Sequence, residues 1–151
     1  MSRVPSEEFS HSFTVPAPAE RIYAHLSEPE SYIGLSPLVV EVRDIRRDGD
    51  RVSYVSVERF RAGPFRHDNP LAVTMTFPQP GRRLVSDVVS PGRVRLVATV
   101  DLLPQGDGTR VTETVRVSFP ALLRPLVLGQ ARKVQRARAA ELTRRMAVTT
   151  T

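Results

Sequence analysis

Apolar and polar residues alternate along most of this chain, and the period of that alternation predicts the order of its elements. Between Phe9 and Val15, large side chains alternate with serine and threonine, which is the two-residue period of a half-buried strand. A proline pair ends this strand, and Pro18 suits the first turn of a helix. A second short helix should follow, with Ser27 as its N-cap residue and Glu30 completing a capping box.

The pattern from Leu38 onward predicts a meander of strands. Most of the separators are short and rich in glycine, proline and aspartate, so the strands they join must be largely antiparallel. The exception is Arg61–Pro70, which is predicted as the only sizeable internal loop. The predicted strands are Leu38–Arg46, Arg51–Phe60, Leu71–Phe77, Arg83–Ser90, Arg93–Leu103 and Thr109–Phe119.

The last segment, Ala121 to Ala147, has the pattern of one long helix. Its length of about 39 Å would let it cross a sheet of ten-residue strands. One face of the helix carries a narrow apolar stripe of Val127, Ala131, Val134 and Leu142. A helix with so few large apolar residues cannot fill the hollow of a curved sheet, so we expect a cavity beneath it.

The size and composition are those of a single soluble domain. We expect one domain over residues 1–151, with an ordered core from about residue 7 to 147. No apolar stretch approaches the roughly 20 residues that span a bilayer, and Met1–Glu8 lacks the apolar centre of a secretory signal. A cytoplasmic location is the simplest expectation. The absence of cysteine excludes disulfides, thiolate metal sites and cysteine nucleophiles.

Positive charge is concentrated at the C-terminal end. Up to Phe119 the chain carries 15 arginines and 15 acidic residues, so the net charge of +6 lies on the last 32 residues. Such a basic helix face could contact an anionic membrane surface. It lacks the interleaved aromatic residues that stack on bases, so we do not expect nucleic acid as a partner. A solvated helix face is the simplest interpretation.

Three segments carry a resemblance to a known superfamily. Phe13–Tyr23 resembles its first strand, Ala-Pro turn and helix start, Ser27–Tyr32 resembles its Asp-Pro-Glu-x-Trp segment, and Gly108–Thr112 resembles the start of its last strand. Over nearly its whole length the chain resembles the SRPBCC superfamily, which joins START lipid-transfer domains, polyketide cyclases and the birch pollen allergen. The resemblance implies an α+β helix-grip fold, in which a seven-stranded curved antiparallel sheet wraps around a long C-terminal helix. Two short helices would lie between strands 1 and 2, and a cavity between sheet and helix would hold a lipid, polyketide or similar molecule.

The faces of the strands predict which polar groups meet such a ligand. In Arg51–Phe60, one face holds Tyr54, Ser56 and Glu58 among the bulkier apolar residues, so we expect this face to point inward. The reverse register would place Tyr54 and Glu58 on the surface. A few polar groups on an apolar wall are the usual lining of a small-molecule site. The predicted ligand-binding residues are Tyr32, Tyr54, Ser56, Glu58, Leu96, Ala98, Glu113, Val134 and Arg138.

Glu113 lies on an otherwise apolar row of the last strand, and this row should face the helix. A buried carboxylate needs either a partner or a proton. The first interpretation is a structural ion pair with Arg138 or Arg145. Ligand binding and general acid catalysis are the alternatives.

The three histidines are scattered along the chain, and only His11 shares a row with aromatic neighbours. A histidine there could shuttle protons, although a histidine satisfied by the backbone is the simpler interpretation. Their spacing does not fit a zinc site, and phosphate loops and dinucleotide fingerprints are absent from the sequence. We therefore predict no metal and no cofactor.

Three functions are compatible with these observations. The first is a carrier or sensor that binds a small hydrophobic molecule without changing it. The second is a polyketide cyclase or aromatase whose pocket acids and bases fold a poly-β-ketone, although the pattern assigns no catalytic residue. The third is a basic module that contacts RNA or a membrane surface. We favour the first, as a monomer or homodimer.

Overall fold

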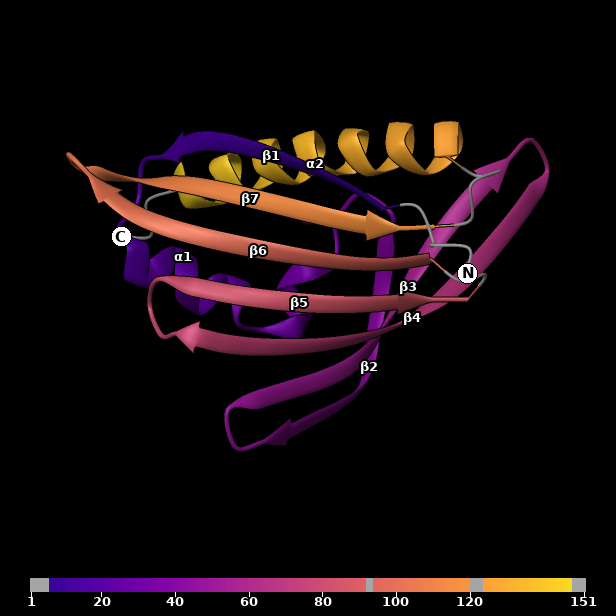
Figure 1. The fold of residues 1–151 in the computed structure, drawn as a ribbon, viewed down its shortest axis with the longest axis horizontal. Coiled ribbons are helices and arrows are strands. Elements are labelled where there is room, and N and C mark those ends of the chain that lie inside the picture. The colour runs from indigo at the N-terminus through magenta and orange to yellow at the C-terminus, as the bar shows by residue number, and fades with distance from the viewer. Residues whose placement is uncertain (1–5, 92–93, 120–123, 148–151) are drawn as a thin grey trace.

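Seven strands form one curved sheet, and a long helix crosses its concave side (Figure 1). The computed structural model describes residues 6–91, 94–119 and 124–147. The strands are β1 (Ser6–Val15), β2 (Val39–Asp48), β3 (Arg51–Ala62), β4 (Phe65–Gln79), β5 (Arg83–Ser90), β6 (Val94–Gln105) and β7 (Gly108–Ser118).

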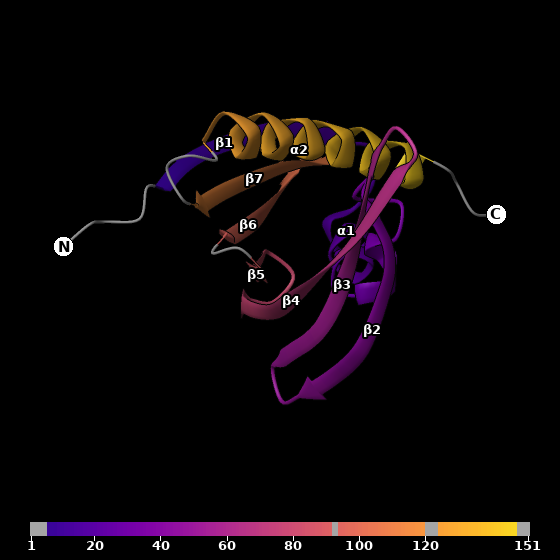
Figure 2. The ribbon, with the colours of Figure 1, turned by 90° about the vertical axis from the view of Figure 1, so that its right-hand side faces the viewer.

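All neighbouring strands are antiparallel, in the order β1-β7-β6-β5-β4-β3-β2. Consecutive strands from β2 to β7 pair with one another, while β1 closes the other edge against β7. Strands β1 and β2 are both edge strands, so the sheet does not close into a barrel. It is nevertheless curved (Figure 2). The predicted α+β class and antiparallel meander are confirmed.

One predicted loop is wrong. The sequence predicts a loop over Arg61–Pro70, but β3 and β4 continue through this segment as a long hairpin. The last residue pair between β4 and β5 is Ala72 with Val89, so the first part of β4 pairs with β3 alone. Pro70 is tolerated there because its missing N–H disrupts no second neighbour.

Two short helices connect β1 to β2, as predicted. They are the α-helix α1 (Ala19–Leu26) and the 3-10 helix η1 (Pro29–Tyr32). The predicted N-cap role of Ser27 is wrong, because Ser27 ends α1 and its hydroxyl donates a 2.7 Å hydrogen bond to the carbonyl of Tyr23. Glu28 occupies the N-cap position of η1 without a side-chain cap, and Pro29 starts the helix.

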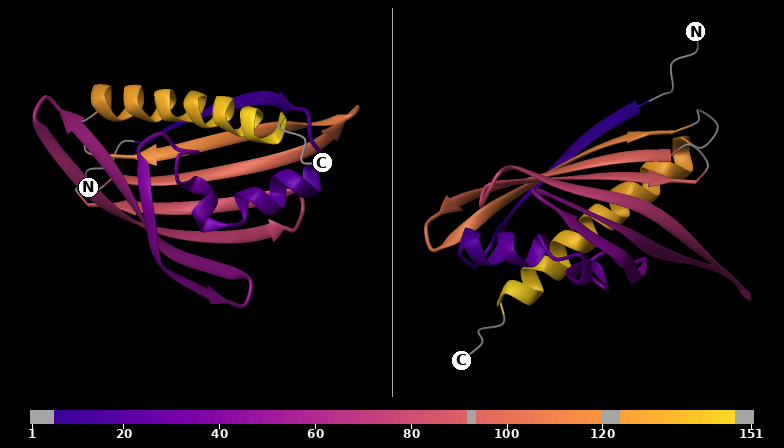
Figure 3. Two further views of the ribbon diagram at one scale, coloured as in Figure 1. Left: turned by 180° about the vertical axis from the view of Figure 1, so that it is seen from behind. Right: turned by 90° about the horizontal axis from the view of Figure 1, so that it is seen from below.

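The C-terminal helix α2 (Arg124–Ala147) runs diagonally across the sheet, with α1 and η1 beside its C-terminal half (Figure 3). Leu142 and Met146 are buried against α1 and the adjoining ends of the strands. Ala131 and Val134 are only half-buried and line a cavity. The predicted start at Ala121 and the side chain of Val127 lie outside the described residues.

The larger of two hydrophobic clusters lies at one end of the molecule, and a smaller one is formed by residues of β3 and β4. The fully buried side chains of the larger cluster include Val15, Ile22 and Leu35, all of which lie near the C-terminal half of α2. Towards the N-terminal half of α2, β7 still buries Val115 and Val117, but many of the apolar side chains that the other strands present are only half-buried. The lean apolar stripe of α2 leaves this part of the hollow unfilled. Among the described residues, no helix is long and apolar enough to cross a membrane.

Candidate functional site

A partly open cavity of about 330 Å³ lies between the inner face of the sheet and α2. Strands β3 to β7 form its floor and walls, α2 forms its roof, and the segment from η1 to β2 closes one side. The expected cavity beneath α2 is therefore present, and its volume lies within the usual range of ligand sites, about 300–1,000 Å³. All nine residues predicted to bind a ligand line it, namely Tyr32, Tyr54, Ser56, Glu58, Leu96, Ala98, Glu113, Val134 and Arg138. Their role in binding stays a prediction.

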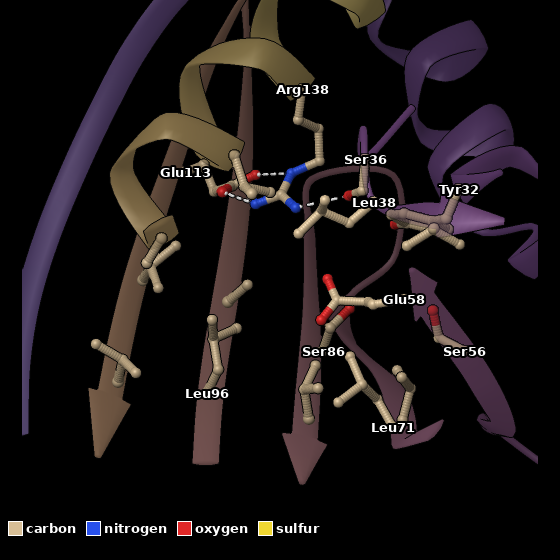
Figure 4. A pocket seen from close by; sticks show the side chains of 18 of the residues that line it. Tyr32, Ser36, Leu38, Ser56, Glu58, Leu71, Ser86, Leu96, Glu113 and Arg138 are labelled. Atoms are coloured by element: carbon tan, nitrogen blue, oxygen red, sulfur yellow. Dashed lines mark hydrogen bonds and ion pairs between the residues drawn. The ribbon is translucent and has the colours of Figure 1, made fainter. Parts of the chain in front are cut away.

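The walls of the cavity are mainly apolar. Alternate residues of each strand point into the hollow, so β6 contributes Leu96, Ala98 and Val100. Strand β3 presents Tyr54, Ser56 and Glu58 in the same way, which confirms the predicted inward register of this strand. Figure 4 shows Ser56 and Glu58 below the helix, on the wall opposite β7.

An ion pair between β7 and α2 crosses the top of the cavity. Arg138 donates from Nε to Oε2 of Glu113 at 3.0 Å and from Nη2 to Oε1, so the pair is bidentate. Its Nη1 donates to the hydroxyl of Ser36 at 2.9 Å. Gln135 donates to the backbone carbonyl of Glu113 at 3.1 Å. The predicted ion pair of Glu113 with Arg138 is therefore present, and it is buried, because Glu113 is only 8% exposed.

Arg145, the other predicted partner of Glu113, holds a different part of the structure. It donates to the backbone carbonyls of Ser31 at 2.6 Å and Ile33 at 2.9 Å, and it pairs with Glu141 at 2.9 Å. A further contact of 3.2 Å joins its Nη1 to Nε2 of His25. Burial, followed by the charges of Arg145 and Arg21, lowers the pKa of His25. Arg145 therefore fixes the segment that closes one side of the cavity.

Burial dominates the protonation behaviour of the polar groups in the cavity. It raises the pKa of Tyr32 and of Tyr54, so both remain neutral hydroxyl groups. It also raises the pKa of Glu58, although the positive charge of Arg138 opposes this shift. For Arg138, burial lowers the pKa, but the charge and hydrogen bonds of Glu113 outweigh it, and the net pKa is raised.

Among the described residues, several of these polar groups have no hydrogen-bond partner. Tyr32 is not among them, because its hydroxyl donates to the carbonyl of Leu26 at 2.7 Å. Within the described part of the chain, no hydrogen bond is found for the Glu58 carboxyl or for the hydroxyls of Tyr54 and Ser56. These groups face the cavity and are available to a bound molecule.

Among the described lining residues, five polar ones are missing from the prediction, namely Ser36, Asn69, Ser86, Ser90 and Gln130. Ser86 lies on β5 between two other inward residues, Leu84 and Val88, so the alternation of that strand carries the signal. Ser36 lies in the irregular segment between η1 and β2, and its position becomes meaningful only through its contact with Arg138. No periodicity in the sequence could have found it.

The histidines contribute little to the cavity. His11 stacks on Phe13 with ring centroids 5.5 Å apart and does not line it. His25 is held by Arg145, as described above, and His67 lies in the β3–β4 hairpin. No group of three or more histidine, aspartate or glutamate side chains within the described ranges is placed to hold a metal ion.

The face of α2 opposite the cavity is basic and exposed. It carries Arg132, Lys133, Arg136 and Arg144. Arg132 lies over the ring of Phe9, with 5.6 Å between its guanidinium carbon and the ring centroid, and Arg144 pairs with Glu141 at 2.6 Å. Part of the basic face is thus committed to contacts within the chain.

Comparison with known proteins gives the family. A family model described as "Polyketide cyclase / dehydrase and lipid transport" matches residues 6–149. A search of curated proteins finds no match. Among solved structures, the chain is similar to TTHA0849 from Thermus thermophilus, with 25% identity and a TM-score of 0.69 over 93% of this chain and 97% of that one.

Two further solved structures share the fold at lower identity. A START superfamily protein from Mycobacterium smegmatis is 16% identical, with a TM-score of 0.77 over 92% of this chain and 96% of that one. The aromatase/cyclase ZhuI from Streptomyces sp. R1128 is 15% identical, with a TM-score of 0.75 over 93% and 96%. The resemblance to the SRPBCC superfamily and its helix-grip fold is confirmed, and the chain belongs to the polyketide cyclase/dehydrase and lipid transport family.

Proposed function

We propose that this chain binds one small hydrophobic molecule in the cavity beneath α2 and acts as its carrier or sensor. The supporting observation is the cavity itself, whose walls are mainly apolar side chains, with polar groups beneath α2 and on the strands of the wall. Ligand sites are typically clefts of about 300–1,000 Å³ with this kind of lining. A volume of about 330 Å³ suits a compact ring system or a single short chain better than a two-chain lipid.

A cavity-filling variant tests this proposal. Ala98→Trp should place an indole in the cavity from β6 and abolish the fluorescence enhancement of an apolar dye, while the fold stays intact. The matched control is Thr99→Trp, which puts the same side chain on the opposite face of the same strand and should leave dye binding unchanged. Equal dye binding by the wild type and both variants would contradict binding in this cavity.

The second candidate function is a cyclase or aromatase. It is favoured by the polar groups that face the cavity and make no hydrogen bond to the described residues, above all the Glu58 carboxyl and the Tyr54 hydroxyl. A carboxyl with a raised pKa can exchange a proton with an enol or a hydroxyl near neutral pH. The test is incubation with a poly-β-ketone: cyclised product that is lost in Glu58→Gln would support the enzyme, and binding without turnover would support the carrier.

A role in contacting RNA or a membrane has weaker support. The basic face of α2 has the required sign of charge, but Arg132 and Arg144 already contact Phe9 and Glu141. Binding to a polyanion through this face would weaken steeply as salt is raised. Polyanion binding that does not weaken as salt is raised would exclude the basic face of α2 as the polyanion site.

A further inference from the structure

The charged residues around the cavity do not favour an anionic ligand. Among the described lining residues, Arg138 is the only cation, and it faces two carboxyl groups, Glu113 and Glu58. Glu113 engages Arg138 through two hydrogen bonds, and Ser36 accepts a third. The positive charge of Arg138 is therefore already compensated, which leaves no free cation among these residues to receive an acidic ligand.

Glu58 is the polar group that a ligand would meet. Its carboxyl points into the cavity from β3, with Ser86 beside it and Arg138 above it (Figure 4). It makes no hydrogen bond within the described part of the chain, and Arg138 attracts it without contacting it. The ionisable groups around it are Tyr54 on β3, Tyr32 on η1, Glu113 on β7 and Arg138 on α2.

We propose that this cavity selects apolar molecules whose polar end is an uncharged hydroxyl or carbonyl group, and that Glu58 recognises this group and excludes carboxylates. The inference rests on the proposed function and names the chemistry of its ligand. A hydroxyl can donate to Glu58, and the hydroxyls of Tyr54 and Ser86 can serve a carbonyl or hydroxyl oxygen. The apolar walls take the rest of the molecule.

A carboxylate ligand would meet a second negative charge in a poorly solvated space. Either the ligand or Glu58 must then take up a proton before both fit. A carboxylic acid with an ordinary pKa near 4.3 is protonated in roughly one molecule in 500 at pH 7. Because burial raises the pKa of Glu58, Glu58 can take up this proton at a lower cost than the ligand. We therefore expect a carboxylate to bind about 10- to 100-fold more weakly than the matching alcohol or phenol at this pH.

Three ring compounds of matched shape test the inference. Binding of naphthalene, 2-naphthol and 2-naphthoate to the purified protein is measured by fluorescence or calorimetry at pH 7 and pH 5. The expected order at pH 7 is 2-naphthol, then naphthalene, then 2-naphthoate. On lowering the pH to 5, binding of 2-naphthoate should strengthen by about 10- to 100-fold, because the cost of taking up one proton falls by up to tenfold per pH unit. Binding of 2-naphthol should change little.

The variant Glu58→Gln separates recognition from a merely structural role. It keeps the shape and an acceptor oxygen, so 2-naphthol should bind within about threefold of the wild type. Without the like charge, 2-naphthoate should bind about tenfold or more tightly at pH 7. The matched control is Glu41→Gln, the same change on an exposed position of β2, which should alter neither ligand.

The outcomes distinguish this inference from the proposed function. If none of the three compounds and no apolar dye binds, the proposed function fails. If they bind with no difference between 2-naphthol and 2-naphthoate, or if Glu58→Gln changes both equally, the proposed function stands and the inference is overturned. Tighter binding of the ammonium compound 2-naphthylmethylamine than of 2-naphthol would overturn the assignment of an uncharged polar end.

Discussion

Replacing Glu113 by glutamine tests whether the ion pair across the cavity holds α2 in place. The side chains of Glu113 and Arg138 are only 10% and 19% exposed, and their bidentate contact joins β7 to α2. Glutamine keeps the shape of Glu113 but turns one acceptor oxygen into an N–H donor that faces the guanidinium. Arg138 is then left charged, buried and only partly hydrogen-bonded.

The expected loss of unfolding free energy for Glu113→Gln is large. Removing one partner of a buried pair typically costs about 3–5 kcal/mol, because the remaining charge has no compensation. A domain of this size has a total stability of about 5–15 kcal/mol. For a chain of 151 residues each kcal/mol corresponds to about 2–4 °C in Tm, so Tm should fall by about 6–20 °C.

Urea denaturation followed by circular dichroism measures this loss. The double variant Glu113→Gln with Arg138→Met should recover most of it, because replacing a whole buried pair with apolar groups is often neutral. Asp101→Asn removes one partner from the pair with Arg83, whose side chains are 40% and 42% exposed, and should cost at most about 1 kcal/mol. A loss for Glu113→Gln as small as that of the exposed control would refute a structural role for the buried pair.

Three further predictions concern packing and pH. Gly108→Ala should lower the unfolding free energy in urea by about 1–3 kcal/mol, because a Cβ would lie 2.5 Å from the carbonyl oxygen of Val15. Gly129→Ala should raise it by up to about 1 kcal/mol, because a Cβ at this position in α2 meets open space. Leu142→Ala should cost about 2–5 kcal/mol by the same assay, because this side chain is 2% exposed in the core; a loss under 1 kcal/mol would contradict its packing role. Because burial raises the pKa of Glu58, the folded state retains its proton above the ordinary value of 4.5, and wild-type stability should fall relative to Glu58→Gln as pH rises through that window. A stability difference between these two proteins that does not change with pH would contradict this sign.

The strands were predictable because most of them bury one face and expose the other. The predicted and observed bounds of β5 coincide, and the other strands differ mainly at their ends. Alternation failed in the β3–β4 hairpin, where Arg66 and His67 are both exposed. A strand that no element covers shows no period, so its residues resemble a loop. The predicted N-cap role of Ser27 failed for a different reason. Its hydroxyl donates a hydrogen bond back to the preceding helix instead of capping the next one.

The cavity wall was more predictable than its polar contacts. The bulk of the inward row identified the face of β3 that holds Tyr54 and Glu58, because the register of a strand follows burial. Arg138 was a candidate because it lies four residues after Val134 and four before Leu142, which places it on the same face of α2 as the apolar stripe. Its choice of Glu113 over other acids, and its contact with Ser36, depend on how α2 crosses the sheet. That crossing is a property of the packed fold and has no local signature.

Native mass spectrometry of the freshly purified protein shows whether the cavity beneath α2 holds a ligand. We expect a population that carries one bound small molecule, which solvent extraction releases and which is absent from Ala98→Trp but present in Thr99→Trp. The extracted compound should be apolar with an uncharged hydroxyl or carbonyl group. A single unliganded mass that no apolar dye, naphthol or naphthalene can shift would contradict the claim that this cavity is a binding site.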